Sequence, residues 1–503
     1  MSRRYKAGTA RNEQALLPAC IEDYVGANNV VRAIDTYVDS LNLKALGFRH
    51  ASGGRTAGQP SFHPGAMLKL YLFSYLNRVS SSRRIAHECR RNLEVIWLLE
   101  GLRPSYRCIA DFRATHGEAL QASCKDFVLL CKKLELLGGE LVAIDGAFFN
   151  GNASDKSILS KRQIEKELEQ IAAQVGAYHQ ALEVQDQAER DQPEAQSRGE
   201  VEALGAKLEQ IKAHQAEREA QLKTLEACDQ TQLSRTDPDA RMLCKSGQRV
   251  VGYNVQSVID AKHKLIVHHE VTNAGNDAEQ LSTQAKAAKE ILQVQTLEAV
   301  ADGGYYSEQE LAACQAAQIT AYVPPCAEHV APEDGRLSCA EFRYDPVQNA
   351  YVCPAGALLL PRKAKAAHED KHNKPDELSR TGYSTRKAVC AACALKDKCL
   401  PPSGKRLIWR SEHAELSAQH RLRMAHEGAE RMKTRASLAE HPFGTLKTWF
   451  GWRHFLLRGF QKVRGEMSLM VLAYNLRRVI NILGQDAFQA HFLRPHTQPA
   501  MAQ

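Results

Sequence analysis

Two aspartates each follow a short apolar run and precede a glycine. Asp145 ends the run 140–146 (ELVAIDG), and Asp302 lies in 297–304 (LEAVADGG). Apolar, β-branched runs of this length predict buried strands, and acids at the ends of neighbouring strands can converge at one edge of a sheet. Glu440, in a segment of helical composition, offers a third carboxylate. Three carboxylates suit Mg²⁺, which prefers oxygen ligands and keeps water, and two such ions roughly 3.5–4 Å apart catalyse phosphoryl transfer. A single Asp-Gly is a common turn, so it is the combination that indicates such a site.

The cysteines carry a second signal. The chain has 14 of them and shows no apolar signal-peptide core near residue 1, so we expect an intracellular protein whose thiols stay reduced. Four of them supply the number of thiols that a closed structural Zn²⁺ site needs: Cys353, Cys390, Cys393 and Cys399. An iron–sulfur cluster is a chemical alternative, and four thiols without a metal are another. Cys326 and Cys339 could also compete as ligands.

Strands and helices around the two aspartates predict an α/β core. Residues 250–260 and 265–271 read as two strands joined by a hairpin turn at 260–264, and a helix is expected over 277–292. The strand that carries Asp302 follows this helix. Strands and helices in this order favour a sheet with helices packed against it.

The N-terminal part reads as helical and basic. Residues 12–135 contain several apolar helical patterns, and a segment at 103–113 is expected to join two helices. Such helices could form a helix-turn-helix that enters the major groove of DNA. Many helical domains, however, carry arginine on solvated faces without binding nucleic acid. The candidate DNA contacts here are Arg83, Arg84, Arg90 and Arg91.

Residues 157–228 have a different character from the α/β core around them. Apolar residues recur in alternating steps of four and three from Ile164 to Leu182 and, after a break at 191–193 and 199, again from Val201 to Ile211. The pattern weakens at 215 and 218 before Leu222 and Leu225. This spacing predicts an antiparallel coiled-coil hairpin. Its role could be that of a spacer, a dimerisation element or a DNA-contacting arm, and the Glu-rich flanks favour the first two.

The overall charge fits a polyanionic partner without requiring one. Lys and Arg number 66 against 58 Asp and Glu, a net charge of +8. The excess is concentrated in residues 1–120 and 403–480, whereas 183–202 is acidic. Since no window of about 18 uncharged apolar residues occurs, we expect no membrane span.

The motifs together resemble those of bacterial insertion-sequence DDE transposases over nearly the whole chain. The residues that carry the resemblance are AIDG at 143–146 with NAS at 152–154, VADGGYY at 300–306, and Arg435 with AEHPFGTLK at 439–447. The resemblance implies an RNase H-like catalytic domain with Asp145, Asp302 and Glu440 as metal ligands. It also implies DNA contacts by Arg435 and Lys447.

The third block departs from the more widespread form of the family signature. Position 436 is alanine and the arginine is Arg435, so the role of this arginine is open. Seven residues are about two helical turns, so Glu440 and Lys447 share a face if the helix is continuous, and Lys447 could contact a DNA phosphate. Pro442 and Gly444 argue against a regular helix there. Further contacts near the site could come from Asn152, Asp277, Tyr305 and Tyr306, for which core or turn roles are the alternative.

We therefore expect a multi-domain α/β protein: an RNase H-like mixed sheet flanked by helices, with an all-α N-terminal domain, a coiled-coil insertion and a small Cys-rich insertion. The expected parts are a helical DNA-binding domain (1–135), three pieces of the core (136–156, 229–310 and 425–485), the coiled coil (157–228), the Cys-rich, zinc-binding insertion (311–424) and a loose tail (486–503).

The function that the resemblance implies is DNA transposition. The enzyme would bind terminal inverted repeats, hydrolyse phosphodiester bonds at the element ends with two Mg²⁺ or Mn²⁺ ions, and join the 3′-hydroxyl ends to target DNA. Because two ends must meet, we expect a homodimer on DNA, in the cytoplasm and on the nucleoid. The alternatives are a catalytically inactive DNA-binding or assembly protein derived from a transposase, and an RNase H-like nuclease without strand transfer.

Overall fold

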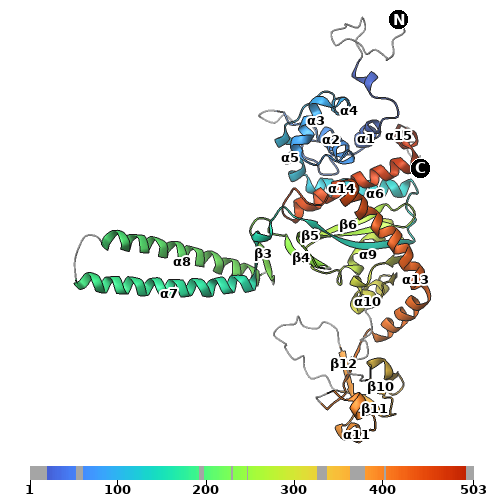
Figure 1. Cartoon of the computed structure of the whole chain (residues 1–503). Coiled ribbons are helices and arrows are strands. Elements are labelled where there is room, and N and C mark those ends of the chain that lie inside the picture. The colour runs from blue at the N-terminus through green and yellow to red at the C-terminus, as the bar shows by residue number, and fades with distance from the viewer. Residues whose placement is uncertain are drawn as a thin grey trace, which may run out of the picture.

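The computed structural model describes residues 20–51, 60–191, 197–227, 230–245, 247–325, 337–362, 380–401 and 404–493. Figure 1 shows a helical N-terminal region, a central sheet and a small Cys-rich module stacked along one axis, with a long helical arm projecting from the sheet region. Cys326 and residues 494–503 of the expected tail lie outside the described residues. In the described part of the chain, no helix is long and apolar enough to cross a membrane.

The central sheet has six strands. The first, β1 (Leu141–Asn150), pairs antiparallel with β5 (Gln248–Asp260) and parallel with β7 (Leu297–Val300). β6 (Ile266–Thr272) continues the antiparallel side, and β8 (Ile319–Tyr322) the parallel side. β4 (Arg241–Lys245) lies beside the first half of β5. This RNase H-like mixed sheet confirms the expected fold class, including the hairpin between β5 and β6.

The strand β1 differs from the expectation in its length. The sequence suggested that it ends at Asp145-Gly146, but the strand continues to Asn150 because its ladder with β5 runs unbroken from Val142, paired with Asp260, to Asn150, paired with Gly252. Asp145 therefore lies in the middle of a strand. The expectation that both aspartates lie at strand ends is wrong for Asp145.

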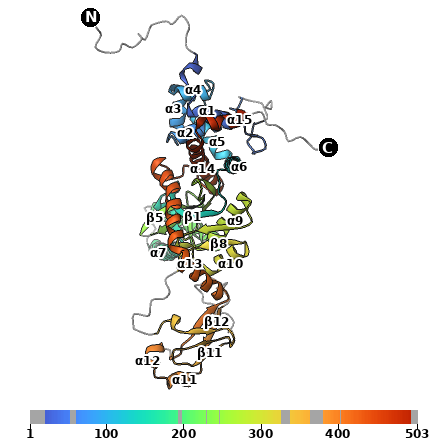
Figure 2. The ribbon, with the colours of Figure 1, turned by 90° about the vertical axis from the view of Figure 1, so that its right-hand side faces the viewer.

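Helices cover both faces of the sheet. The 31-residue α13 (Ala414–Gly444) covers one face, and α9 (Leu281–Leu292) and α10 (Glu308–Ala316) cover the other, as Figure 2 shows. Since successive side chains of a strand alternate between faces, Ala143 packs with Leu438 under α13, whereas Val142 and Ile144 pack on the side of α9 and α10. Asp145 is thereby directed to the α13 face.

Six α-helices form most of the N-terminal region: α1 (Val30–Asp39), α2 (Pro64–Leu76), α3 (Ser82–Arg91), α4 (Leu93–Leu98), α5 (Tyr106–Thr115) and α6 (Gly117–Lys133). Pro64 starts α2 at a position where its missing N–H costs nothing. The segment 103–113, expected as a connection, is mostly the helix α5 itself. Ser105 caps it by accepting a hydrogen bond from the Cys108 N–H at 3.3 Å.

The helix α14 (Phe460–Leu483) links this region to the sheet. Its apolar side chains belong to one core that includes buried residues of α1 to α6 and of β5 and β6. The crossing with α6 is very close, because a Cβ at Gly465 would lie 2.5 Å from the Gly117 Cα. The short helix α15 (Gln485–Leu493) follows and places Phe488 in the same core. Residues 485–493 are therefore not a loose tail.

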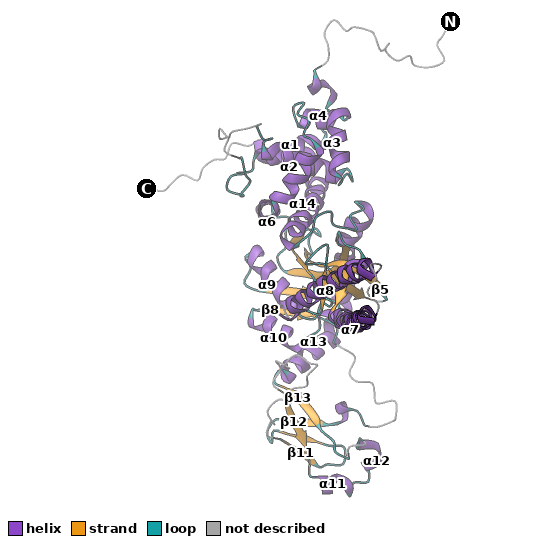
Figure 3. Cartoon of the chain, turned by 90° about the vertical axis from the view of Figure 1, so that its left-hand side faces the viewer, coloured by secondary structure: helices purple, strands orange, loops and turns teal. Residues whose placement is uncertain are grey.

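The arm consists of α7 (Lys161–Asp191) and α8 (Ser197–Ala227), two helices of 31 residues each that lie side by side. Figure 3 views the pair from the end of the arm. At its base, the strands β2 (Ile158–Ser160) and β3 (Gln232–Ser234) pair antiparallel. Ile164 and Leu225 are buried between the helices near that base. The arm is thus anchored to the core by the short two-stranded sheet.

The Cys-rich module has a sheet of its own with five strands: β9 (Arg343–Asp345), β10 (Ala350–Val352), β11 (Leu358–Pro361), β12 (Arg380–Ser384) and β13 (Ile408–Ser411). Two short helices, α11 (Lys387–Ala391) and α12 (Lys396–Cys399), flank it. Its core is small and consists of Phe342, Leu359, Tyr383 and Ile408. A module of this size buries little apolar surface, and cross-links or metals commonly stabilise such modules.

Candidate active site

Asp145 and Asp302 meet at one guanidinium group. Nη2 of Arg435, on α13, lies 3.1 Å from Oδ1 of Asp145 and 3.5 Å from Oδ2 of Asp302. The three side chains are 17% to 30% exposed, so the cluster is partly open to solvent. A single cation thus already bridges the two carboxylates.

The register of the parallel strands explains why the aspartates meet. Ala143 of β1 is aligned with Val300 of β7, and each aspartate follows its aligned residue by two positions. Beyond Val300 the chain turns into η3 (Gly303–Tyr305), where Oδ1 of Asp302 accepts a hydrogen bond from the Gly304 N–H at 2.9 Å. The other carboxylate oxygen of Asp302 contacts Arg435.

Glu440 lies apart from this pair. Its side chain is exposed, whereas the preceding Leu438 and Ala439 are buried against the sheet. Five residues of helix separate it from Arg435, which corresponds to a rotation of about 140° and a rise of about 7.5 Å. Among the described residues, no group of three or more His, Cys, Asp or Glu side chains is placed to hold a metal ion. The structure therefore brings two of the three expected acids together and leaves the third on another face of α13.

The helix α13 passes through Pro442 and ends at Gly444. Thr445–Trp449 then form a π-helical turn, η5. Because proline has no N–H, the Leu438 carbonyl lacks its regular helical partner at this point. Lys447 lies in the π-helical turn, where its Nζ donates a hydrogen bond to the Phe148 carbonyl of β1 at 2.8 Å. Glu440 and Lys447 are thus not on one regular helix.

Two family models match this chain. The Transposase domain (DUF772) family matches residues 19–115, and the Transposase DDE domain family matches residues 223–476. The second match covers half of the chain, including Asp302, Arg435, Glu440 and Lys447. The chain belongs to the Transposase DDE domain family. Asp145 lies before the matched residues, and its contact with Arg435 is what brings it together with Asp302. No curated protein and no solved structure matched the chain.

A buried polar network lies behind the two aspartates of the transposase. Asp277 is 5% exposed, and its Oδ1 accepts hydrogen bonds from Asn254 Nδ2 at 2.8 Å and Gln256 Nε2 at 2.7 Å. The Tyr305 hydroxyl donates to Gln256 Oε1. The expected helix 277–292 begins only at Leu281, so Asp277 lies in the preceding turn. The sequence pointed to Asp277 and Tyr305 but not to the side-chain amides of Asn254 and Gln256. The sequence of a buried strand does not show which residues of other segments its polar side chains contact.

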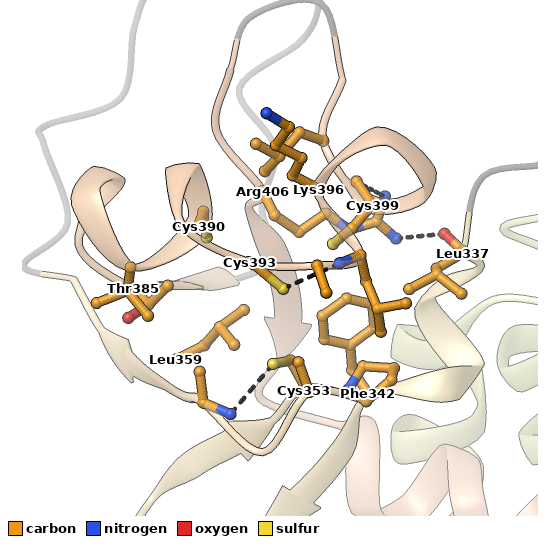
Figure 4. A pocket seen from close by; sticks show the side chains of 17 residues that line it. Leu337, Phe342, Cys353, Leu359, Thr385, Cys390, Cys393, Lys396, Cys399 and Arg406 are labelled. Carbon is orange, nitrogen blue, oxygen red and sulfur yellow. Dashed lines mark hydrogen bonds between the residues drawn. The ribbon is translucent and has the colours of Figure 1, made fainter.

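Four cysteines of the transposase line one cavity. Cys353, Cys390, Cys393 and Cys399 border a cavity of about 280 Å³, and Figure 4 shows them around it. Backbone N–H groups donate to two of the thiols: Ala357 to Cys353 at 3.2 Å and Leu395 to Cys393 at 3.4 Å. Burial raises the pKa of Cys390 and of Cys399, and the neighbouring thiols add to the shift. Cys339 is exposed and does not border the cavity.

The four candidate arginines of the N-terminal region are all exposed on α3. Arg83 lies over the ring of Tyr106, the first residue of α5, at 5.4 Å. Arg91 pairs with Glu88 at 2.5 Å. The helices α3 and α5 therefore present arginine and an exposed aromatic side chain on neighbouring surfaces.

Proposed function

We propose that this transposase cleaves phosphodiester bonds at the ends of an insertion element and joins the freed 3′-hydroxyls to target DNA. The observation that carries the proposal is the convergence of Asp145 and Asp302 on one cation, the Arg435 guanidinium. Two acidic side chains that already share a cation can share a divalent metal ion. Family membership supports the same reaction class.

The donor set suits Mg²⁺ or Mn²⁺. Both aspartates offer carboxylate oxygens, which hard divalent ions prefer, and their partial exposure leaves room for water and for a DNA phosphate. Two bound ions would activate the attacking oxygen and stabilise the leaving one. The protein itself orients the acids through the β1–β7 register. Arg435, displaced from the carboxylates, and Lys447 at the edge of β1 would contact DNA phosphates.

Glu440 would complete the site through a rearrangement at the end of α13. Its side chain is on the wrong face, but the helix is weakened beside it by Pro442 and by the π-helical turn. A rotation of the segment around residue 440 would direct the carboxylate toward the aspartates, and it would also shift Leu438 and Ala439, which are buried against the sheet. Binding of metal and DNA would favour this arrangement, since the third carboxylate gains a cation to contact.

The test is cleavage and strand transfer with labelled end DNA and a supercoiled target plasmid. Asp145→Asn, Asp302→Asn and Glu440→Gln should abolish both reactions and leave end binding intact. Glu430→Gln, at another exposed glutamate of α13, is the matched control and should remain active. Cleavage without joining would support the nuclease alternative, and binding without cleavage by the unaltered protein would support the inactive DNA-binding alternative. An Asp302→Asn protein that still cut DNA would refute the assignment.

We also propose that α3 and α5 contact the terminal repeats. Arg83 and Arg84 are exposed and suited to phosphate contacts, as are Arg90 and Arg91 at the other end of α3. Each lost phosphate contact should reduce the slope of log affinity against log salt by about 1. A gel-shift titration of Arg83→Ala with Arg84→Ala should therefore show a slope lower by about 2, and an unchanged slope would contradict the assignment.

For the Cys-rich module we propose a structural Zn²⁺ ion held by Cys353, Cys390, Cys393 and Cys399. The four thiols border one cavity, and N–H donors to sulfur are the contacts that favour the thiolates a metal needs. Ligation would draw the thiols closer together than they lie here. The purified protein should carry about one equivalent of zinc, and Cys393→Ser should lose it while Cys339→Ser keeps it. Less than a small fraction of an equivalent, with melting unaffected by a chelator, would refute the site.

We further infer a homodimer on DNA, because joining two element ends requires two bound ends in one complex. The arm of α7 and α8, with its seam of apolar residues, is a candidate dimerisation element. Light scattering with and without end DNA, on the full chain and on a variant without residues 165–221, would test both points.

A further inference from the structure

The transposase has no side chain at position 146, directly after the first aspartate, and polar groups fill the space. A Cβ on Gly146 would lie 2.6 Å from Gln256 Nε2, 2.8 Å from Asp277 Oδ1 and 3.0 Å from the Tyr305 hydroxyl. Gln256 is 0% exposed and Asp277 5%. The backbone of β1 therefore packs against a buried carboxylate one residue after Asp145, on the face opposite to Arg435.

The network connects β1 and the η3 turn, which hold the two aspartates, through β5 between them in the hydrogen-bonded chain. Gly146 belongs to β1 with Asp145, and Gln256 is paired with Gly146 across the ladder of β1 and β5. Tyr305 belongs to the η3 turn that Asp302 begins, and its N–H donates to the Asp302 carbonyl at 3.1 Å. Gln256 lies between Asp277 and Tyr305, because it donates to Oδ1 of Asp277 and accepts from the tyrosine hydroxyl.

The charge on Asp277 fixes the direction of the hydrogen bonds that link Asp277, Gln256 and Tyr305. An ionised carboxylate can only accept, so Gln256 must direct its amide nitrogen toward Asp277 and its oxygen toward Tyr305. The hydroxyl of Tyr305 must then donate.

We propose that Asp277 is a positioning residue of the catalytic metal site: it holds the Asp302 turn against β1 and adds a buried negative charge behind the two ligands. This inference rests on the proposed metal-dependent function. Such outer groups orient carboxylate ligands, and their loss commonly weakens metal binding by about 10- to 100-fold. Asp277 accepts hydrogen bonds from Asn254 and Gln256 on the far side of β1.

The alternative is that Asp277 only stabilises the fold, and a matched control separates the two. Asp260 is another buried carboxylate of this domain, 0% exposed, but it accepts hydrogen bonds from the backbone N–H groups of Gly138, Gly139 and Lys262, away from the aspartates. Asp260→Asn should lower the melting temperature and leave metal binding unchanged. Asp277→Asn keeps the size of the side chain and removes its charge.

The experiment titrates Mn²⁺ into the full chain without DNA. The electron paramagnetic resonance signal of the free ion measures how much Mn²⁺ remains unbound. We expect the dissociation constant of Asp277→Asn to rise about 10-fold or more, and that of Asp260→Asn to stay within a factor of two. Tyr305→Phe, which removes only the hydroxyl, should raise it several-fold and decides the question if Asp277→Asn does not fold.

The outcomes separate this inference from the proposed function. If the unaltered protein binds Mn²⁺ and loses it in Asp145→Asn, while Asp277→Asn and Tyr305→Phe bind as tightly as the unaltered protein, Asp277 has no positioning role and the metal site stands. If the unaltered protein binds no Mn²⁺, or binds it equally well without Asp145, the metal site itself is wrong, and the inference falls with it.

Discussion

The guanidinium of Arg435 occupies the position between the carboxylates that a metal ion would take, so its removal should destabilise the metal-free protein and raise its affinity for metal. At an effective dielectric constant of about 20, a charge pair at the 3.1 Å that separates Arg435 from Asp145 attracts by about 5 kcal/mol before solvation is counted. Partial exposure of all three side chains reduces this strongly. We expect a net contribution of about 1–2 kcal/mol to the metal-free fold.

The variant Arg435→Gln should therefore melt about 2–8 °C lower than the unaltered protein in the presence of a chelator, since 1 kcal/mol shifts the melting temperature of a large domain by about 2–4 °C. At saturating Mn²⁺ the melting temperatures of the two proteins should converge. The ion no longer has to displace the guanidinium, so its affinity should rise about 5- to 30-fold, the factor that corresponds to 1–2 kcal/mol.

The assay is a melting curve at increasing Mn²⁺ concentration for both proteins. Arg431→Gln is the control, because Arg431 lies one turn earlier on α13 and pairs with Glu298 at 2.8 Å without contacting the aspartates. It should lower the melting temperature and leave the response to Mn²⁺ unchanged. A weaker response to Mn²⁺ in Arg435→Gln than in the unaltered protein would show that the arginine supports metal binding and would refute the reasoning.

Three further predictions concern the fold. Burial lowers the pKa of His269 to about 3 and that of His268 to about 4. Below pH 6.5 the unfolded chain therefore binds more protons than the folded one, so the free energy of unfolding should fall as the pH drops from about 6.5 toward 4. Each histidine should contribute a decrease of up to about 1.4 kcal/mol per pH unit. Urea titrations should show this slope, reduced in His269→Gln. Gly465→Ala, at the crossing of α14 and α6, should cost about 1–3 kcal/mol, whereas Gly444→Ala, with open space around it, should change thermal melting little. Asn475 pairs with both the N–H and the carbonyl of Ile266 at 2.9 Å; Asn475→Ala should lose about 2 kcal/mol or more in urea unfolding, and an effect no larger than that of the exposed Asn481→Ala would contradict the role assigned to it.

The sequence predicted the parts of the site that local pattern controls. Asp145 and Asp302 follow apolar runs, and strand periodicity locates such residues without knowledge of the fold. Arg435 was identified by its place in the family signature, but its contact with both aspartates depends on how α13 crosses the sheet. The position of Glu440 could not be predicted either, because it depends on whether the helix continues through Pro442 and in which rotation.

Pairing across the sheet explains the remaining differences. β1 extends beyond Asp145 because β5 offers partners as far as Asn150, and Gly146 is tolerated there because the network around Asp277 needs the space. Gln256 and Asn254 look like ordinary polar residues of a strand, and only the tertiary fold places them on the buried face. The break in the arm, by contrast, follows from local residues, and the two helices α7 and α8 lie on either side of it as expected.

During synthesis on the ribosome, the N-terminal helical core cannot close until α14 has been made. The core of α1 to α6 is finished by side chains of α14, whose last residue, Leu483, is added 350 residues after Lys133 at the end of α6. At about 5–20 residues per second this interval lasts about 20–70 s. The helices that we propose to bind the element's ends thus wait for nearly all of the catalytic core before their own core closes. A prematurely terminated chain would lack that closure, and should neither compete for the ends nor escape proteolysis.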